Sequence, residues 1–442
     1  MGVLSWENNK REEVVSMIKE WFRRHEAELI KTAEFIFEHP EIALQEKESS
    51  KCLAEYLERK GFEVQWNISE METAFLAQWG DGEPVIGFLA EYDALPRLGQ
   101  PVSYEEQMNG EPGHGCGHNL LGTACAGAAA ALKAWMEKEQ VKGTIRVYGC
   151  PAEEIVYGKI KMNNDGVFDD LSVAVTWHPF ARNRVSYDIW QAQDVKMYKF
   201  YGVSAHASQH PELGRSALDA AELMNVGVNY LREHVSDDVR MHYAYTSPNG
   251  AANIVPAFAS TKYFIRAAKA STKDDASVRV DNCAKGAALM TGTRVEIETL
   301  IHHKEMKVNR VLAEAFYHAM ERVAVPEYTK EELDFAENIS RCAGFENEGE
   351  YFTGLEPLES EPVRLAIGTD VSDMSHTVPT IMLSAATMCK GTPLHHWAAT
   401  AQSGMSIGYK GMMYAAECMA EGCVDLLKNP GLIDKAWELH RK

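Results

Sequence analysis

The chain has 442 residues and a formal net charge of −20, and these two properties already narrow its possible functions. A chain of this length exceeds one hydrophobic core, so two domains are expected. The negative charge argues against nucleic acid or an anionic membrane as the main partner. The hydrophobic fraction of 45% and the charged fraction of 24% are ordinary for a soluble globular protein.

Targeting signals and disulfides are also not expected. Charged residues as early as Glu7 and Lys10 leave no room for the apolar core of a signal peptide. No run of roughly 18 apolar residues suggests a membrane span. The nine cysteines are an odd number at scattered spacings, which favours free thiols over a disulfide framework. We therefore expect a reduced, cytoplasmic protein.

In the first part of the chain, helical and extended patterns alternate. An amphipathic helix is predicted from about residue 11 to 38, ending before Pro40, and a second from 47 to 60, ending at Gly61. Apolar, β-prone runs follow, and His118 opens a helix between the second and third of them. These predicted strands are Ala74–Trp79, Val85–Ala90, Ile145–Cys150 and Val173–Trp177. The alternation indicates an α/β fold with a mixed, largely parallel sheet flanked by helices.

The pattern changes between residues 193 and 303, where the order becomes β-α-β-β-α-β. This order resembles the ferredoxin-like motif, so we expect a smaller α+β domain inserted between catalytic segments 1–192 and 304–442. Its predicted elements are strand 195–201, helix 215–231, strands 241–246 and 258–266, helix 276–290 and strand 294–300.

After Asn309 the α/β pattern resumes with helices. Extended runs are predicted at residues 363–367 and 379–384, and a long helix is predicted from about 406 to 428. The segment 346–361, rich in Glu and Gly, is the expected flexible loop.

The segment Gly113–Asn119, with the sequence GHGCGHN, is the most informative part of the chain. Cys116 and His118 are spaced to place a thiolate and an imidazole on one metal ion, and the glycines allow the backbone to fold tightly around it. An isolated Cys-Gly-His would be a weak signal.

Other residues of metal-binding type support this interpretation. Glu153 and Glu154 follow one predicted strand, His178 ends another, and His395 lies near the C-terminus. Ligands of α/β sheets bind where the carboxyl ends of strands meet loops. Thiolate, imidazole and carboxylate groups at five positions exceed what one tetrahedral zinc needs, and a hydrolytic site with two metals explains the surplus better.

Each of these residues also has a less specific explanation. A single histidine is more often a surface or core residue than a ligand, and His396 is expected to point away from the site. Glu153 and Glu154 could be a solvated acidic pair. Asp93 follows a strand and could either orient a ligand histidine or cap a turn.

Six phrases, in order along the chain, resemble the aminoacylase- and carboxypeptidase-G-type metalloamidases. The similarity is to their cysteine-containing branch, which includes p-aminobenzoyl-glutamate, auxin-conjugate and hippurate hydrolases. The phrases are EYDAL (91–95), GHGCGHNLLG (113–122), GCPAEE (149–154), TWHP (176–179), GRSALDA (214–220) and GTPLHHW (391–397). One departure is Ile155-Val156-Tyr157, which stands where a close relative has a glycine-rich turn.

The resemblance implies two divalent metal ions per chain, Mn²⁺ or Zn²⁺. Cys116 would bridge them, His118 and His178 would complete one site, and Glu154 and His395 the other.

The resemblance also implies further site residues around the metals. Glu153 would be the general base, Asp93 would orient a ligand histidine, and His206 would stabilise the oxyanion from the partner subunit of a homodimer formed by the inserted lid domain. The implied substrate-binding residues are Asn253, Arg266 and Gly391.

Together these features predict a metal-dependent amidohydrolase that cleaves the amide bond of N-acyl or N-aroyl amino acids, which are small-molecule substrates. The leading candidate is p-aminobenzoyl-glutamate. The alternatives are another conjugate such as an indole-acetyl amino acid, a small dipeptide, or a non-catalytic metal-binding subunit. A homologous partner chain is also possible.

Overall fold

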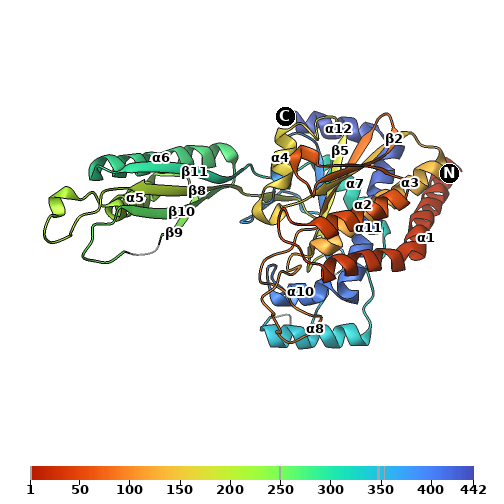
Figure 1. The fold of residues 1–442 in the computed structure, drawn as a ribbon. Coiled ribbons are helices and arrows are strands. Elements are labelled where there is room, and N and C mark those ends of the chain that lie inside the picture. Colours follow the sequence, from red (N-terminus) through yellow and green to blue (C-terminus); the bar gives the residue numbers. More distant parts are fainter. Residues whose placement is uncertain (1, 248–249, 346–348, 353) are drawn as a thin grey trace. The chain divides into compact units, whose positions relative to one another are not determined.

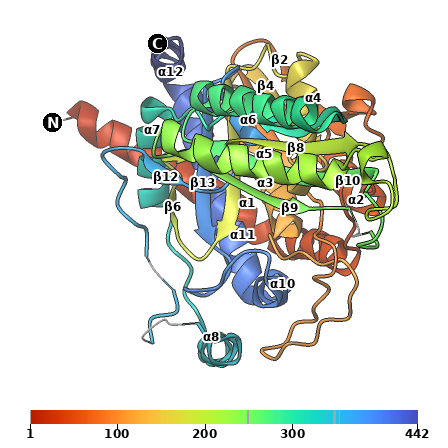
Figure 2. The same cartoon turned by 90° about the vertical axis from the view of Figure 1, so that its left-hand side faces the viewer.

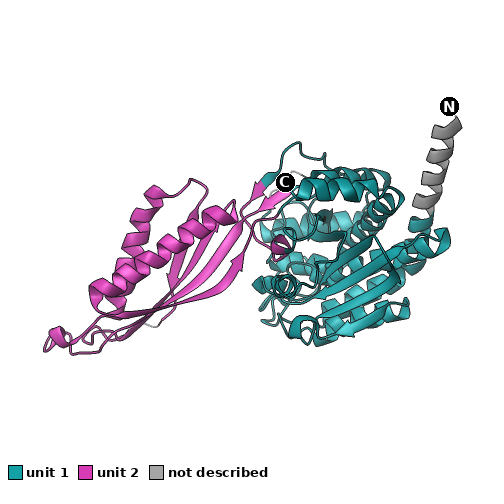
Figure 3. Cartoon of the chain, turned by 90° about the horizontal axis from the view of Figure 1, so that it is seen from above, with its two compact units in different colours: residues 1–187, 307–363, 374–442 teal, residues 188–306, 364–373 magenta. Residues whose placement is uncertain are grey.

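The computed structural model describes residues 2–247, 250–345, 349–352 and 354–442, and it divides into two compact units (Figures 1 and 3). Unit 1 comprises 1–187, 307–363 and 374–442, and unit 2 comprises 188–306 with 364–373. The boundaries expected at 193 and 303 lie inside unit 2. Unit 2 also contains the segment 364–373, which was expected in the catalytic part. A backbone hydrogen bond from the Gln191 N–H to the Ile367 carbonyl attaches this segment to the unit.

Unit 1 contains a seven-stranded sheet in the order β1-β2-β4-β3-β5-β13-β6. The four central strands run parallel, and β1, β2 and β6 are antiparallel to their neighbours. This confirms the predicted mixed, largely parallel sheet. The strands are β1 (Glu63–Trp66), β2 (Phe75–Asp81), β3 (Val85–Glu91), β4 (Gly143–Cys150), β5 (Val173–Phe180), β6 (Arg184–Val185) and β13 (Thr380–Ala386).

The central helix of unit 1 is α3 (His118–Glu139), which packs against α1, α11 and strand β3. Its buried face is rich in alanine, including Ala124, Ala128 and Ala131, and side chains of this size allow neighbouring helices to approach closely. The other helices are α1 (Gly2–Glu38), α2 (Lys47–Arg59), α4 (Gly158–Asn164), α7 (Arg310–Arg322), α8 (Lys330–Ala343), α10 (Trp397–Ser403), α11 (Ser406–Lys428) and α12 (Gly431–His440).

Unit 2 has the predicted β-α-β-β-α-β order. Its sheet is antiparallel in the order β11-β8-β10-β9, and Figure 2 shows its two helices side by side over the strands. The core between the layers includes Tyr198, Phe200, Tyr263 and Ile265. The elements are β8 (Ala192–Tyr201), α5 (Ala217–Leu231), β9 (Arg240–Tyr245), β10 (Phe258–Ala267), α6 (Ala270–Thr291) and β11 (Arg294–His303).

Short elements occur where the chain passes between the units. Strand β7 (Asp188–Trp190) pairs with β12 (Val363–Leu365), and α9 (Val371–Met374) follows. Of the loop predicted at 346–361, residues 346–348 and 353 lie outside the described residues, and the described remainder contains no helix or strand. Among the described helices, none has the length and apolar character needed to cross a bilayer.

Candidate metal centre

The cysteine and histidine of the glycine-rich segment lie at the start of α3. Gly117 is the N-cap of this helix and has a φ of 75°, the left-handed conformation that favours glycine. A Cβ atom at this position would approach the Pro179 side chain to 2.9 Å. The tight turn that results buries both Cys116 and His118.

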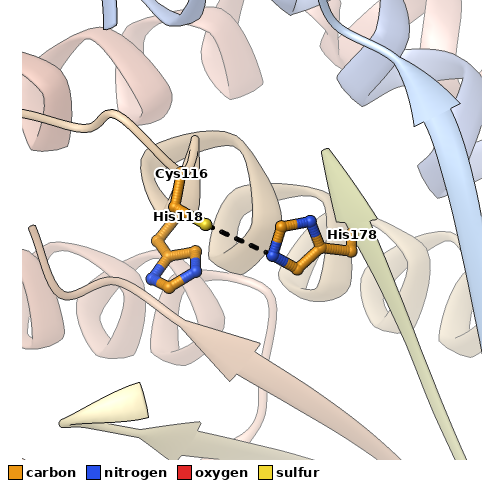
Figure 4. Close-up of side chains that lie close together, drawn as sticks. All are labelled: Cys116, His118 and His178. Atoms are coloured by element: carbon orange, nitrogen blue, oxygen red, sulfur yellow. Dashed lines mark hydrogen bonds between the residues drawn. The ribbon is translucent and has the colours of Figure 1, made fainter. Parts of the chain in front are cut away.

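The five predicted ligands gather in two groups that share Cys116. One group is Cys116, His118 and His178 (Figure 4), and the other is Cys116, Glu154 and His395; within each group, the donor atoms lie within 4.8 Å of one another. The carboxyl ends of β3, β4 and β5 meet at one edge of the sheet, which brings these distant residues together.

The separations between donor atoms suit common metal ions. Two atoms each about 2.1 Å from one cation lie roughly 3.0–3.4 Å apart when the angle between them is square to tetrahedral, and slightly further apart if one is sulfur. Cys116 Sγ lies 3.4 Å from His178 Nε2, and Glu154 Oε2 lies 3.3 Å from His395 Nε2.

The ring orientations of the two buried histidines also suit metal ligands. His118 Nδ1 lies 2.8 Å from Asp93 Oδ1, and His178 Nδ1 lies 2.8 Å from the Pro179 carbonyl. A histidine that donates from one nitrogen to such an acceptor presents the other to a metal. His118 Nε2 is buried and has no hydrogen-bond partner among the described residues, so a bound cation would satisfy it.

Asp93 contacts both sides of the site. Its Oδ1 faces His118, and its Oδ2 accepts a hydrogen bond of 2.8 Å from the Glu154 backbone N–H. The buried Asp93 carboxylate therefore holds both the His118 ring and the turn that carries Glu153 and Glu154.

The turn with Glu153 and Glu154 is a single 3₁₀ turn between two left-handed residues, Ala152 and Val156, with φ of 63° and 54°. Glu46 stabilises it, because its Oε1 accepts a hydrogen bond of 2.9 Å from the Ala152 N–H. Burial, followed by the charge of Asp93, raises the pKa of Glu46 to about 7. Glu46 was not expected from the sequence, because it lies more than a hundred residues from the turn that it supports.

The predicted C-terminal ligand, His395, lies on a second strained turn. Gly391 has a φ of 88° and His395 a φ of 57°, and the His395 N–H donates to the Gly115 carbonyl at 3.0 Å. His396 points elsewhere, as expected, and its ring accepts from Ala398 N–H to cap α10.

The electrostatics of the site depend on burial. Burial raises the pKa of the Cys116 thiol, whereas a nearby divalent cation favours the thiolate. Burial lowers the pKa of His178 to about 4, which keeps this ring neutral and able to ligate at neutral pH. Burial alone would lower the pKa of His118, but the charge of Cys116 and the hydrogen bond to Asp93 outweigh burial and raise this pKa above its ordinary value. A proton and a cation therefore compete for the ring.

Glu91 and Lys159 are two further buried residues at this site that were not identified from the sequence. Glu91 Oε2 lies 3.3 Å from His118 Nε2, and Glu91 Oε1 lies 2.8 Å from Lys159 Nζ. Burial raises the pKa of Glu91, but the charges of Lys159 and His118 lower it below its ordinary value. Glu91 ends β3, two residues before Asp93. Acidic residues at this spacing at a strand end were a signal that could have identified it.

The remaining predicted residues belong to unit 2. His206 and Asn253 lie on adjacent segments, because His206 is bridged to Ile254 and the Ala207 N–H donates to the Asn253 carbonyl at 3.0 Å. Arg266 is near the other end of β10, where it donates to the Ala366 carbonyl at 3.0 Å. Ten strand residues span roughly 30 Å at about 3.3 Å each, so Asn253 and Arg266 of one chain do not meet at one carboxylate.

Unit 2 contains one more group of metal-ligand type, formed by Asp194, Asp274 and His302. The Lys273 ammonium lies among its donors, at 2.8 Å from Asp194 Oδ1, 3.0 Å from Asp274 Oδ1 and 3.0 Å from His302 Nδ1. A lysine therefore already occupies the place of a cation in this group.

Comparisons with known proteins agree with this geometry. The family model "Peptidase family M20/M25/M40" matches residues 87–399, more than half of the chain. One of the chains of the p-aminobenzoyl-glutamate hydrolase of Escherichia coli (strain K12) is 39% identical over 439 residues, which cover 93% of this chain and 91% of the relative. The Xaa-Arg dipeptidase of Mus musculus is 31% identical over 294 residues, covering 64% of this chain and 65% of the relative.

A solved structure shares the fold. The YXEP protein of Bacillus subtilis, described as a dinuclear metal binding peptidase from the M20 family, superimposes with a TM-score of 0.61 at 18% identity, and the match covers 92% of this chain and 99% of that chain. The family match, the near full-length relative and the two donor groups lead to one conclusion: this chain is a metal-dependent hydrolase that belongs to peptidase family M20/M25/M40.

Proposed function

We propose that this protein hydrolyses the amide bond of N-acyl or N-aroyl amino acids at a centre with two metal ions. The observation that carries the proposal is the pair of donor groups sharing Cys116 beside the buried carboxylate of Glu153. His118 and His178 would hold one ion, and Glu154 and His395 the other. When bound, the two ions polarise the amide carbonyl and make a nearby water more acidic.

Glu153 is the proposed general base. It is buried, and its Oε2 lies 4.0 Å from His118 Nε2, further than two ligands at square to tetrahedral angles on one ion. Glu153 would accept a proton from the attacking water and pass it to the nitrogen of the departing amino acid. The strained turn fixed by Glu46 and Asp93 keeps it beside Glu154.

The types of donor atom indicate which metal ions suit this centre. Thiolate and imidazole suit Zn²⁺, and carboxylate oxygens also suit Mn²⁺, so both are proposed. A bridging thiolate needs reducing surroundings, and the described cysteines are all free, which supports a cytoplasmic location.

The leading substrate is p-aminobenzoyl-glutamate, because the 39% identical relative is named for its hydrolysis. Dipeptides are the second candidate, since the Xaa-Arg dipeptidase is also similar. The side chains of Ile155 and Tyr157, next to the base, are 47% and 40% exposed. These two apolar groups would provide a wall for an aromatic acyl group.

The substrate's carboxylate is proposed to bind Arg266. Its Nε is buried without a hydrogen-bond partner among the described residues, although its Nη1 is bonded to the Ala366 carbonyl. An arginine presents a planar fork that suits a carboxylate. Gly391 is proposed to shape the pocket through the turn that leads to His395.

His206 and Asn253 are proposed to act together in the site of a partner subunit, since they lie side by side and far along the strand from Arg266. The Gln209 N–H donates to His206 Nδ1 at 3.1 Å. The proton of the neutral ring is therefore on Nε2, where it can be donated to the oxyanion that forms during attack.

The helices of unit 2 are the proposed dimer interface. Tyr230 on α5 and Leu289 and Met290 on α6 are 76%, 85% and 68% exposed, which is unusual for such large apolar side chains. A second copy of the chain would cover them. A homologous partner chain is the alternative, because the Escherichia coli relative is named as one of the subunits of its hydrolase.

The proposal is tested by a hydrolysis screen of the purified chain with Mn²⁺ and with Zn²⁺, using p-aminobenzoyl-glutamate, an indole-acetyl amino acid, hippurate and an Xaa-Arg dipeptide. We expect the highest kcat/KM for p-aminobenzoyl-glutamate. No turnover of any conjugate, with two ions bound, would favour a non-catalytic metal-binding role. Activity only after a homologous chain is added would favour that partner over a homodimer.

The shared site is tested by mixing inactive His206→Ala chains with inactive Glu153→Gln chains. Partial recovery of activity in mixed dimers is expected, because one of the two sites then has an intact base and an intact partner histidine. Confirmed subunit exchange without recovery would contradict action across the dimer.

A further inference from the structure

The carboxylates of Glu91 and Asp93 each face one of the two ring nitrogens of His118. Asp93 Oδ1 lies 2.8 Å from His118 Nδ1, and Glu91 Oε2 lies 3.3 Å from His118 Nε2. Asp93 forms a hydrogen bond with the ring through Nδ1, whereas His118 Nε2 and Glu91 Oε2 both lack a hydrogen-bond partner among the described residues. The two carboxylates therefore have different relations to the same histidine.

The separation of Glu91 Oε2 from His118 Nε2 is that of two ligands on one ion. It equals the 3.3 Å between Glu154 Oε2 and His395 Nε2. Both atoms are buried and polar, and leaving them unsatisfied is costly, whereas one cation between them would satisfy both. Glu91, His118 and Glu153 also form one of the groups whose donor atoms lie within 4.8 Å of one another.

The other oxygen of Glu91 is held by a buried lysine. Lys159 Nζ lies 2.8 Å from Glu91 Oε1, and the lysine side chain is fully buried. Lys159 reaches this place because α4 begins immediately after the turn with the two glutamates. The chain returns so closely there that a Cβ on Gly158 would lie 1.8 Å from the Pro151 carbonyl oxygen.

We propose that Glu91 is a sixth metal ligand, bound through Oε2 to the ion shared by Cys116, His118 and His178, and that Lys159 holds Oε1 so that the carboxylate binds through one oxygen. The inference rests on the proposed two-metal centre. Retaining Oε1 on lysine leaves a coordination position open for water or substrate, which a carboxylate bound through both oxygens would occupy.

The test compares metal affinity and spectra of wild type, Glu91→Gln and Lys159→Met, using Zn²⁺ and Mn²⁺ titrations against a chelator and the Co²⁺-substituted protein. Glu91→Gln should weaken one of the two sites by at least roughly tenfold and leave the other unchanged. It should also change the intensity of the Co²⁺ d–d bands, because the coordination number of that ion falls. The weakened site should be the one lost in His178→Ala and retained in His395→Ala.

Lys159→Met should act in the opposite direction. Removing the ammonium leaves Glu91 with an uncompensated buried charge, which destabilises the metal-free protein and is relieved when an ion binds. We expect tighter binding at the same site, and a loss of Tm that is larger without metal than with it. The matched control is Lys273→Met, which removes a buried lysine of unit 2 and should lower the stability of that unit equally with and without metal.

The possible failures are distinguishable. If wild type binds fewer than two ions after reconstitution, the proposed centre is wrong. If wild type binds two ions but Glu91→Gln keeps both affinities and the Co²⁺ spectrum, Glu91 is not a ligand, and the two-metal centre stands. If Lys159→Met fails to fold, Glu91→Gln still decides. Weakened binding in both variants would indicate general damage to the site and would overturn the proposal.

Discussion

Both units bury a lysine beside a carboxylate and a histidine, but the lysine has a different place in each cluster. In unit 2, Lys273 Nζ lies among the donors, within 3.0 Å of Asp194, Asp274 and His302. In unit 1, Lys159 Nζ contacts Glu91 Oε1, while Glu91 Oε2 faces His118, whose Nε2 has no hydrogen-bond partner among the described residues.

The difference shows that metal-ligand residue types within a few ångströms of one another do not by themselves make a metal site. A metal site also needs donor atoms that are not already engaged by a hydrogen bond or an ion pair. In the cluster of Asp194, the Lys273 ammonium already contacts all three donor residues, so a cation would have to displace a buried ammonium. The cluster of Cys116 has buried donors that need a further partner.

The largest expected effect separates the two roles within the unit 1 cluster. Glu153→Gln keeps the shape of the side chain and removes its basicity, so kcat should fall by roughly 10²–10⁴-fold while both ions remain bound. Glu154→Gln should instead reduce the number of bound ions. Elemental analysis and single-turnover kinetics on both variants check this. Exchanged behaviour would mean that the roles of the two adjacent glutamates are reversed.

The next effect tests the lysine of unit 2. Lys273→Met leaves the buried Asp194 carboxylate without its ammonium, and breaking a buried pair in this way costs about 3–5 kcal/mol. Hydrogen exchange in β8 and β11, measured by mass spectrometry, should reveal the loss in unit 2. The double variant Lys273→Met with Asp194→Leu is the control and should recover much of the stability. An unchanged exchange rate in the single variant would show that the pair contributes little.

A third comparison uses one histidine from each cluster. His178→Ala should reduce the bound ions to fewer than two per chain, because it removes one of the proposed ligands of the first ion. His302→Ala should leave the count unchanged, since Lys273 fills the place of a cation in that cluster. Elemental analysis after reconstitution measures both. Loss of an ion in His302→Ala would remove the distinction between the clusters.

The smallest expected effect is a pH dependence in unit 2. Burial raises the pKa of Asp194, but hydrogen bonds from His302, Lys273 and Ser277 lower it below the ordinary value of 3.8. The folded pKa lies below the unfolded one, so this contribution to stability is complete above pH 3.8 and is lost as the pH falls further toward the folded value. Chemical denaturation monitored in unit 2 should show that the free energy of unfolding falls as the pH is lowered below 3.8. A Ser277→Ala variant, which lacks one of the donors, should show a smaller fall.

Much of the fold follows from the sequence because its pattern is local. The helix expected from residue 406 to 428 is α11, and the β-α-β-β-α-β order of unit 2 is visible in periodicity alone. Strand β1 (Glu63–Trp66) was not predicted, because it has only four residues and most of them are exposed. The attachment of 364–373 to unit 2 depends on backbone hydrogen bonds that no residue pattern reveals.

The site was predicted less completely than the fold. Cys116, His118, Glu154, His178 and His395 do come together, and the resemblance to a known family identified them. Glu46 and Lys159 were not found, because a buried charge in an otherwise ordinary helical segment looks like a surface residue in the sequence. The separation of Asn253 from Arg266 along β10 also needed the strand's actual extent.

The segment 364–373 has a practical consequence for dividing this protein into parts. A simple insertion would make the chain pass between the units twice. Here the chain also crosses at both ends of the segment 364–373, which makes four crossings. A fragment cut at the expected boundaries, 193–303, would lack the Ala366 carbonyl, which accepts a hydrogen bond from Arg266. A longer fragment, 188–306, would also lack Asp373, which accepts a hydrogen bond from the Lys304 N–H. An excised unit 2 therefore needs residues 364–373 joined to residues 188–306 by a linker, and one way to provide this is a circularly permuted gene.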